Sequence, residues 1–196
     1  TYKLKRESHL ARQFFGARQT RIRQRRVVAD TTQLHQCGQN LDASALAKVY
    51  IVEEHSPAVQ AIMRRGGIAT SRWSLVELAS GLQRRHREGL LDRETVDRIA
   101  GEIKTDAEGL TLQDVTPAIL DSAIGLINRH GLRTGDAVHL ATSLALRQPS
   151  GDGPEFLAFD RKLNEAARAE GCRLVEVGKL ARGGARKAID PTPENG

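Results

Sequence analysis

The sequence predicts an α/β protein, a three-layer α/β/α sandwich in which helices cover both faces of a mostly parallel central sheet. Short apolar runs of strand length alternate along the chain with longer segments of helical periodicity. Glycine and proline separate many of these segments, and alternating strands and helices favour parallel strands joined by helical crossovers. The length of 196 residues suits one such domain with a hydrophobic core.

The expected elements follow one another from residue 41 onward. Helices are expected at 43–53, 57–65, 74–88, 91–107, 117–130, 134–147 and 161–169, and strands at 68–71, 110–115, 155–159 and 173–177. Pro57 stands in a first turn, and Gly131 and Gly171 stand where helices end, as these residue types commonly do. The helix at 134–147 has small apolar side chains on most faces, so it should be largely buried.

A first strand should lead into the helix at 43–53. Residues 36–40 read Gln-Cys-Gly-Gln-Asn, which is a poor strand because it lacks β-branched and aromatic side chains. Whether this stretch can form a strand decides how firmly Asp42, which follows it closely, is held in place.

Basic residues are concentrated at the start of the chain. Residues 1–40 hold nine Lys and Arg against two acidic residues, a net charge of +7, whereas the whole chain carries +6. The high positive charge is therefore no reason to predict nucleic-acid binding by the folded part. We expect a basic N-terminal arm at 1–40 that is disordered or non-native, a folded domain at 41–177 and a flexible tail at 178–196.

Several classes of protein are excluded by missing motifs. No apolar run approaches the roughly 18 residues that a membrane span needs. Cys37 and Cys172 lie far apart without a CxxC pair, which favours a reduced, cytoplasmic protein. The chain contains neither GxGxxG nor GxxxxGK[ST], so two common nucleotide-binding loops are absent from it.

Four acidic residues fall near the ends of predicted strands. Asp42 follows the presumed first strand, Glu77 lies early in the helix after 68–71, Asp136 begins the buried helix, and Asp160 follows 155–159. In an open parallel sheet the carboxyl ends of the strands share one edge, where ligands bind. The four carboxylates are therefore expected to meet there.

Each acid also has a plain structural interpretation. Asp42 and Asp160 fit helix N-caps, Ser74 and Glu77 fit a capping box, and Asp136 would suit the helix dipole. Together, however, four carboxylates repel one another unless positive charge lies among them. Lys48 and Arg161 are candidates for one or two of the acids.

A hard divalent cation would neutralise the whole set. Carboxylate oxygens are the ligands that Mg²⁺ and Mn²⁺ prefer. Such a site typically acts on phosphates, because the metal polarises a phosphoryl oxygen and lowers the pKa of a bound water.

The acids and their flanking residues resemble the PIN domain, in the form found as the toxin of bacterial VapBC toxin–antitoxin pairs. Four stretches carry the resemblance in order, and together they cover about residues 41–177: LDASALAKVY (41–50), ATSRWSLVELASGLQRR (69–85), LRTGDAVHLATSLAL (132–146) and FLAFDRKLNEAARAEG (156–171). The resemblance implies an α/β/α sandwich and an endoribonuclease that depends on Mg²⁺ or Mn²⁺. A metal-activated water would attack the RNA phosphodiester in line and leave a 5′-phosphate.

The resemblance also implies roles for individual residues. Asp42, Glu77, Asp136 and Asp160 would form the acidic quartet, with Asp42 and Asp136 as the main metal ligands, Glu77 as a ligand or water-positioning group, and Asp160 acting partly through water. Ser44 matches the small hydroxyl residue near the metal, and Thr134 would hold the loop before Asp136. The implied partners are RNA, a cognate antitoxin and a second copy of the chain.

Three features depart from the family pattern. The usual apolar strand before the first Asp is replaced by residues 36–40, the arm at 1–40 is extra, and Ala158 stands where Ser or Thr is common. One hypothesis covers the first two: the arm is upstream or out-of-frame coding sequence, in keeping with a first residue that is not Met. The rival hypothesis is a genuine basic arm that binds RNA.

Other residues have two interpretations each. His139 could act as a general base, but the favoured interpretation is a helix residue packed near the core. Trp73 could stack an RNA base, but the favoured interpretation is a core or helix contact. For the basic residues 84–87 the favoured interpretation is a solvated helix end, and the other is a phosphate contact. For the apolar residues at 43–65 the plain interpretation is core burial, and the other is binding to an antitoxin or to a second copy of the chain.

Two alternative functions stay open beside the ribonuclease. The first is a catalytically impaired PIN-like domain that only binds RNA or protein. The second is another Mg²⁺ phosphohydrolase or a receiver domain. The receiver is disfavoured because the late strand end carries Asp160 and Arg161 where receivers place a Lys.

Overall fold

The computed structural model describes residues 38–147 and 153–177. Its sheet has four strands in the order β3-β2-β1-β4, and all neighbouring pairs are parallel. The strands are β1 (Gln39–Leu41), β2 (Ile68–Ser71), β3 (Thr111–Gln113) and β4 (Glu155–Leu157). The helices are α2 (Ala43–Tyr50), α3 (Ser56–Arg65), α4 (Arg72–Arg87), α5 (Arg93–Ala107), α6 (Pro117–His130), α7 (Thr134–Ala145) and α8 (Arg161–Ala169).

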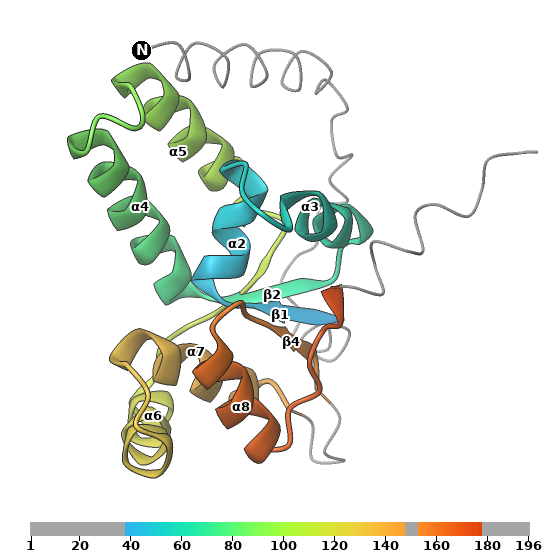
Figure 1. Cartoon of the computed structure of the whole chain (residues 1–196). Helices are drawn as coiled ribbons and strands as arrows, with labels where there is room; N and C mark the ends of the chain where they lie inside the picture. The colour runs from blue at the N-terminus through green and yellow to red at the C-terminus, as the bar shows by residue number, and fades with distance from the viewer. Residues whose placement is uncertain (1–37, 148–152, 178–196) are drawn as a thin grey trace, which may run out of the picture.

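The helices lie in two layers, one on each face of the sheet. Figure 1 shows α2 and α3 above the sheet, with α4 and α5 rising as a long antiparallel pair, and α6, α7 and α8 below it. Each face has its own hydrophobic core, and β4 serves both: Leu157 packs into the upper core while Phe156 and Ala158 pack into the lower one. The alternation follows from the two-residue period of a strand. The predicted α/β/α sandwich is confirmed.

The stretch that looked like a poor strand supplies the central strand β1. Its residues pair with β2 on one side and β4 on the other, and Asn40 and Leu41 are almost fully buried. The Gly38 amide donates to the Gly67 carbonyl at 2.8 Å, and the Asp42 amide donates to the Leu157 carbonyl at 3.0 Å, which extends the ladder beyond both ends. Hydrogen bonding to two neighbours therefore outweighs the low strand propensity of this segment.

Some predicted boundaries differ from the structure. β2, α6 and α8 have the predicted limits, but the strand expected at 173–177 is reduced to a single parallel bridge between Leu174 and Phe156. The helix α4 begins two residues early because the Ser71 hydroxyl caps it, accepting from the Trp73 amide. The capping box predicted for Ser74 and Glu77 is therefore wrong.

The basic segment at 84–87 forms the last turn of α4, at the far end of the helix from the sheet (Figure 1). Arg85 pairs with Glu53, and His86 Nδ1 lies 2.9 Å from the Leu91 carbonyl. The cationic side chains suit the negative end of the helix dipole. Among the described residues no helix is long and apolar enough to cross a membrane. Of the arm predicted at 1–40, residues 1–37 lie outside the described part, as does the tail predicted at 178–196, whereas Gln39 and Asn40 belong to β1.

Candidate functional site

Asp42 is the most constrained of the predicted site residues. It is 4% exposed and caps α2, where its Oδ1 accepts from the Ala45 amide at 2.7 Å. The Ser44 hydroxyl lies 2.9 Å from each carboxylate oxygen, so Ser44 donates to the group that the resemblance placed beside it. Burial raises the pKa of Asp42 to about 6, the capping hydrogen bond opposes this rise, and Asp136 adds to it. The carboxylate is thus held in place but poorly compensated.

Asp136 lies in the first turn of α7 and is half-buried. Burial raises its pKa, Asp160 raises it further, and Glu77 adds a smaller effect of the same sign. Arg133 and His139 act in the opposite direction. Asp160 and Glu77 thus act on Asp136, and Asp136 acts on Asp42, which links the four predicted carboxylates electrostatically. We call them the carboxylate cluster (Asp42, Glu77, Asp136 and Asp160).

Glu77 reaches the cluster from α4 and is fixed there by α7. Its Oε2 lies 2.5 Å from His139 Nε2, and His139 is 4% exposed. A Cβ at Gly135 would lie only 2.6 Å from Glu77 Oε1, so the start of α7 is in close contact with this carboxylate. The preferred interpretation of His139, a packed helix residue, agrees with its burial. Its contact with Glu77, like the role of Gly135, was missed in the sequence.

Asp160 and Thr134 border the same edge of the sheet. Asp160 is exposed and caps α8, where its Oδ1 accepts from the Leu163 amide at 2.8 Å. Thr134 opens α7 and is also exposed. Its hydroxyl makes no hydrogen bond to the residues that the structure describes, so the predicted support of the preceding loop is not seen.

The two basic residues proposed as internal counter-charges are engaged elsewhere. Lys48 pairs with Glu53 at 3.2 Å and lies over the Phe159 ring, and Arg161 pairs with Glu165 at 3.1 Å. Of the nearby basic side chains, Arg133 acts on Asp136 from an exposed position. The negative charge of the cluster is therefore only partly balanced by the protein.

The donor set fits a hard divalent cation in its chemistry. It offers carboxylate oxygens, and the raised pKa values of Asp42 and Asp136 show that a positive charge there would stabilise their ionised forms. The side chains do not converge on one point, however. Within 38–147 and 153–177, no three His, Cys, Asp or Glu residues are arranged as a metal-binding group.

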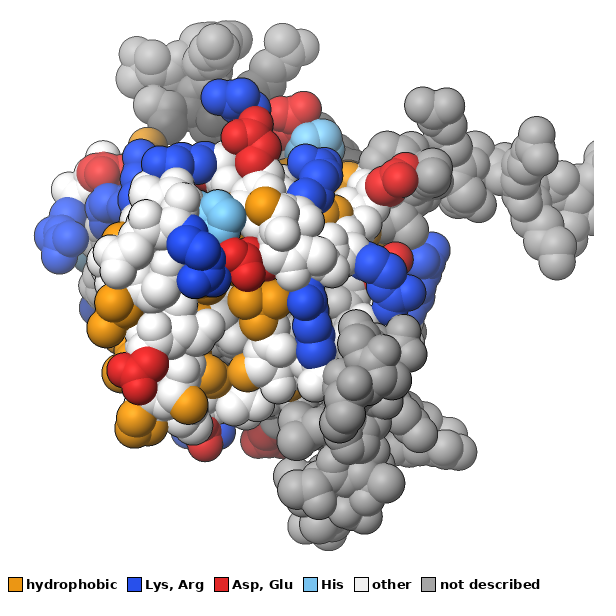
Figure 2. All heavy atoms as spheres, turned by 90° about the horizontal axis from the view of Figure 1, so that it is seen from below, with side chains coloured by type: hydrophobic (Ala, Val, Ile, Leu, Met, Phe, Trp, Pro, Cys, Tyr) orange, Lys and Arg blue, Asp and Glu red, His pale blue; other side chains and the backbone are white. Residues whose placement is uncertain are grey.

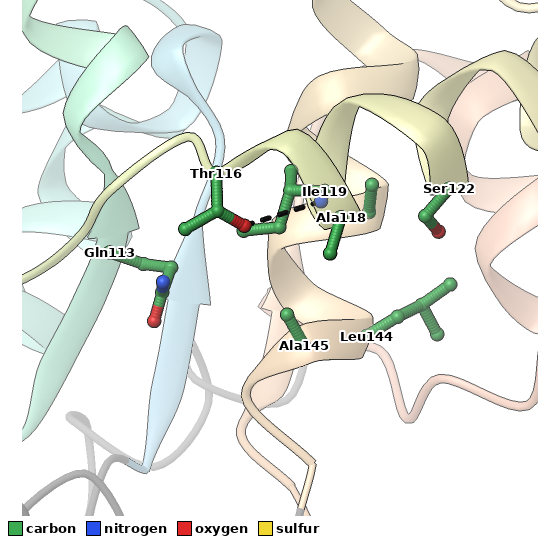
Figure 3. A pocket seen from close by; sticks show the side chains of 8 residues that line it. Gln113, Thr116, Ala118, Ile119, Ser122, Leu144 and Ala145 are labelled. Atoms are coloured by element: carbon green, nitrogen blue, oxygen red, sulfur yellow. Dashed lines mark hydrogen bonds between the residues drawn. The ribbon is translucent and has the colours of Figure 1, made fainter.

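A separate hollow lies between β3, α6 and α7 (Figure 3). Its volume is about 340 Å³, and it is lined by Gln113, Thr116, Ala118, Ile119, Ser122, Ala141, Leu144 and Ala145. None of these is a member of the carboxylate cluster. The Thr116 hydroxyl is already used as the cap of α6, accepting from the Ile119 amide at 3.3 Å. We assign no chemistry to the hollow.

Comparison with known proteins identifies the family. The PIN domain matches residues 41–169, about two thirds of the chain and the part that contains all four acids. The chain belongs to the PIN domain family. Over 62 residues it is 39% identical to Ribonuclease VapC45 and to Ribonuclease VapC49, from two strains of Mycobacterium tuberculosis. The aligned part is 32% of this chain, and the chain spans about two fifths, 41%, of the length of these relatives.

Two solved structures resemble the PIN domain described here. PAE2754 from Pyrobaculum aerophilum is 19% identical, with a TM-score of 0.55 over 75% of this chain and 91% of that one. The Mycobacterium tuberculosis toxin VapC20, described as cleaving the sarcin–ricin loop, is 18% identical, with a TM-score of 0.53 over 70% of this chain and 98% of that one. At these identities the likeness shows the fold alone.

Proposed function

We propose that this PIN domain is an endoribonuclease that depends on Mg²⁺ or Mn²⁺ and serves as the toxin of a toxin–antitoxin pair. The observation that carries the proposal is the shared electrostatics of the carboxylate cluster: buried Asp42 and half-buried Asp136 both have raised pKa values, and their neighbours leave them under-compensated. Family membership and the relatives named as VapC ribonucleases support the same activity.

Asp42 and Asp136 would be the main ligands of the cation, with Glu77 as a third and Asp160 acting partly through water. A divalent cation in such a site supplies a Lewis acid for the phosphoryl oxygen and lowers the pKa of a bound water. The protein supplies the orientation. Asp42 is fixed by the α2 cap and by Ser44, and Glu77 is held by His139.

Arg133 has the properties of a phosphate-positioning residue. It is exposed, precedes the first turn of α7, and lies close enough to Asp136 to lower the pKa of that carboxyl. It forms no ion pair with the part of the chain that the structure describes. A guanidinium in this position would bind the RNA phosphate on the side away from the carboxylates.

The non-catalytic alternative depended on a poorly formed strand before Asp42. That strand is formed and central, and the Asp42 backbone is tied to β4. The alternative therefore loses its main support. The apolar residues of α2 and α3 mostly lie in the upper core, which agrees with core burial as the role of the apolar residues at 43–65. A cognate antitoxin, a homodimer and a cytoplasmic location remain part of the proposal.

The test is cleavage of a mixed pool of RNA sequences with Mg²⁺ by the wild-type chain and by Asp136→Asn. We expect cleavage by the wild-type chain and none by the variant. The matched control is Asp92→Asn, because Asp92 is also a helix-associated carboxylate, the cap of α5, but is exposed and outside the cluster. Equal cleavage by wild type and Asp136→Asn would remove the proposed site. Failure of all three chains would favour the binding module.

A further inference from the structure

The single tryptophan of the chain is exposed at the start of α4. Trp73 is the second residue of that helix, and 41% of its surface is accessible. Trp73 is therefore not a core residue, because the buried stripe of α4 is formed by Ser74, Leu78 and Leu82. The helix contact predicted as its other structural role stays a prediction. Among the large hydrophobic side chains exposed in the described part, Trp73 is the one aromatic. Single exposed hydrophobic residues are common on protein surfaces, so the exposure alone assigns no role to the indole, and its place relative to the carboxylate cluster decides the argument.

Trp73 lies on the same face of α4 as Glu77. The two are four residues apart, a spacing that places side chains one above the other on a helix with their Cβ atoms roughly 5–6 Å apart. Helical side chains lean toward the N-terminus of their helix. For α4 this is the end at the carboxyl edge of the sheet, where β2 passes into the helix (Figure 1). The indole therefore borders the carboxylate cluster on the side of Glu77.

The first turn of α4 is fixed on both sides of Trp73. Arg72 pairs with Asp114, which follows β3, and the Ser74 hydroxyl lies 2.7 Å from the buried Thr70 hydroxyl. The Trp73 amide itself donates to Ser71. Because this helix turn is firmly held, an aromatic side chain on it keeps its position when a ligand stacks on the ring, so little conformational entropy is lost on binding.

We infer that Trp73 stacks an unpaired base of the RNA whose phosphate occupies the carboxylate cluster, an inference that rests on the proposed function. Single-stranded RNA is commonly bound by bases stacked on aromatic side chains while the backbone follows positive charge. Here Arg133 supplies a positive group at the cluster, and Trp73 supplies an exposed aromatic face. The base next to the cleaved phosphodiester would be the one that stacks.

Basic side chains on the lower face of the molecule are scattered. Figure 2 shows that Lys and Arg are spread over the lower face of the molecule, singly or in small groups, without forming one continuous stripe. The described residues of the lower face therefore offer no broad electrostatic surface to bind an RNA backbone.

The rival role for Trp73 is a protein contact made together with Val76, which is 56% exposed and three residues further along α4. A helix that docks on a protein usually continues its apolar stripe through the next turns. On this side of α4 the following exposed positions are Ala79, Ser80, Gln83 and Arg84. Beyond Val76 only the small Ala79 extends the apolar surface before polar residues take over, which favours a base over a protein partner.

Steady-state cleavage of a short single-stranded RNA tests the inference. We expect Trp73→Ala to raise KM about thirty-fold, the middle of the range for losing one stacked base, with kcat changed less than about two-fold. Trp73→Phe should recover most of the loss because it keeps an aromatic face. Val76→Ala is the matched control, because it truncates another exposed apolar residue of the same helix, and it should leave KM unchanged.

An unchanged KM in Trp73→Ala would overturn the inference. So would a loss of dimer or of antitoxin binding, without a change in KM, because it would assign Trp73 to a protein contact. Either result would leave the ribonuclease proposal standing, since the wild-type chain would still cleave.

Fluorescence of the single tryptophan gives an independent measurement. In Asp136→Asn, which should leave the RNA uncut, a short single-stranded RNA should quench Trp73 emission in a saturable way, whereas linear polyphosphate of equal charge should not. Binding of the RNA without quenching, or equal quenching by both probes, would contradict stacking. Because the measurement needs no cleavage, quenching in Asp136→Asn together with a wild-type chain that cuts no RNA would support stacking while overturning the proposed function.

Discussion

His139 Nε2 lies 2.5 Å from Glu77 Oε2, and the histidine is almost fully buried while the glutamate is partly open to solvent. The pair joins α7 to α4 at the carboxyl edge of the sheet, and its histidine lies one turn after Asp136 on the same helix. The contact therefore orients a carboxylate of the cluster from within the core. In this arrangement His139 is a positioning residue, since it acts on the site through Glu77.

We predict that His139→Gln lowers the cleavage rate about ten- to a hundred-fold, the usual cost of removing a residue that orients a ligand. Glutamine keeps much of the volume but not the ring geometry that meets Glu77. Initial rates at saturating RNA measure the effect, and the concentration of Mg²⁺ needed for half-maximal rate should rise as well.

The chain contains a matched control for this variant. His130 Nε2 lies 2.7 Å from Glu170 Oε1, a second histidine–glutamate pair, but neither residue belongs to the carboxylate cluster. His130→Gln should therefore leave both the rate and the Mg²⁺ requirement unchanged. If the two variants behaved alike, the effect of His139 would be on stability and the positioning role would be wrong.

We predict that Asp42→Asn stabilises the metal-free protein at pH 7.5 while abolishing cleavage. Asparagine is as good an N-cap as aspartate, so the α2 cap is kept and only the buried charge is lost. Raising the pKa of Asp42 from 3.8 to about 6 corresponds to a penalty of up to about 3 kcal/mol for the ionised form. Chemical denaturation in EDTA measures the gain.

The sign of the pH dependence follows from the same shift. The folded state binds the Asp42 proton more tightly than the unfolded state, so the contribution of this group favours folding below pH 3.8 and is lost as the pH rises through about 6. Asp42→Asn should remove this part of the slope of the free energy of unfolding against pH. Asp92→Asn is the control: hydrogen bonds with Thr95 lower the pKa of Asp92, so this variant should not gain stability. A wild-type stability that rises between pH 4 and 6, with the same slope in Asp42→Asn, would refute the prediction.

We predict that Mg²⁺ or Mn²⁺ raises the melting temperature of the wild-type chain at pH 7.5. A ligand present at about a hundred times its dissociation constant stabilises the folded state by about 2.7 kcal/mol. The effect should shrink as the pH falls below about 6, because protons then compete for Asp42. Asp92→Asn should respond like wild type and Asp42→Asn should respond less. An identical shift in both variants would place the cation outside the cluster.

The elements that sequence reasoning found correctly have strong local signals. Pro117 at a first turn and Gly131 in the left-handed conformation after the last turn define α6, and both are visible in the sequence. The place of the acids along one edge of the sheet also follows from local information, because each lies near the carboxyl end of a strand and parallel strands share that edge.

The features that were missed depend on contacts between distant residues. β1 is a strand because β2 and β4 flank it, and its own three residues give little sign of this. The contact between Glu77 and His139 joins residues 62 positions apart. The sequence held a partial signal for this contact. His139 lies three residues after Asp136 on the same helix, so the two side chains occupy neighbouring parts of the helix surface. The exposure of Trp73 depended on the start of α4, which the sequence placed two residues late.

Gly135 provides the last prediction, because it separates stability from activity. Its missing Cβ would lie 2.6 Å from Glu77 Oε1, so Gly135→Ala must displace the carboxylate or its helix. Alanine gains up to about 1 kcal/mol of helix propensity over glycine, which offsets part of the clash. We therefore expect a small change in melting temperature and a loss of cleavage of at least about ten-fold, as for other changes that displace an orienting contact. Gly101→Ala is the control, because a Cβ at this helical glycine would meet nothing within 4 Å. It should raise the melting temperature and leave the rate unchanged, whereas full activity in Gly135→Ala would show that the position of Glu77 is not needed for cleavage.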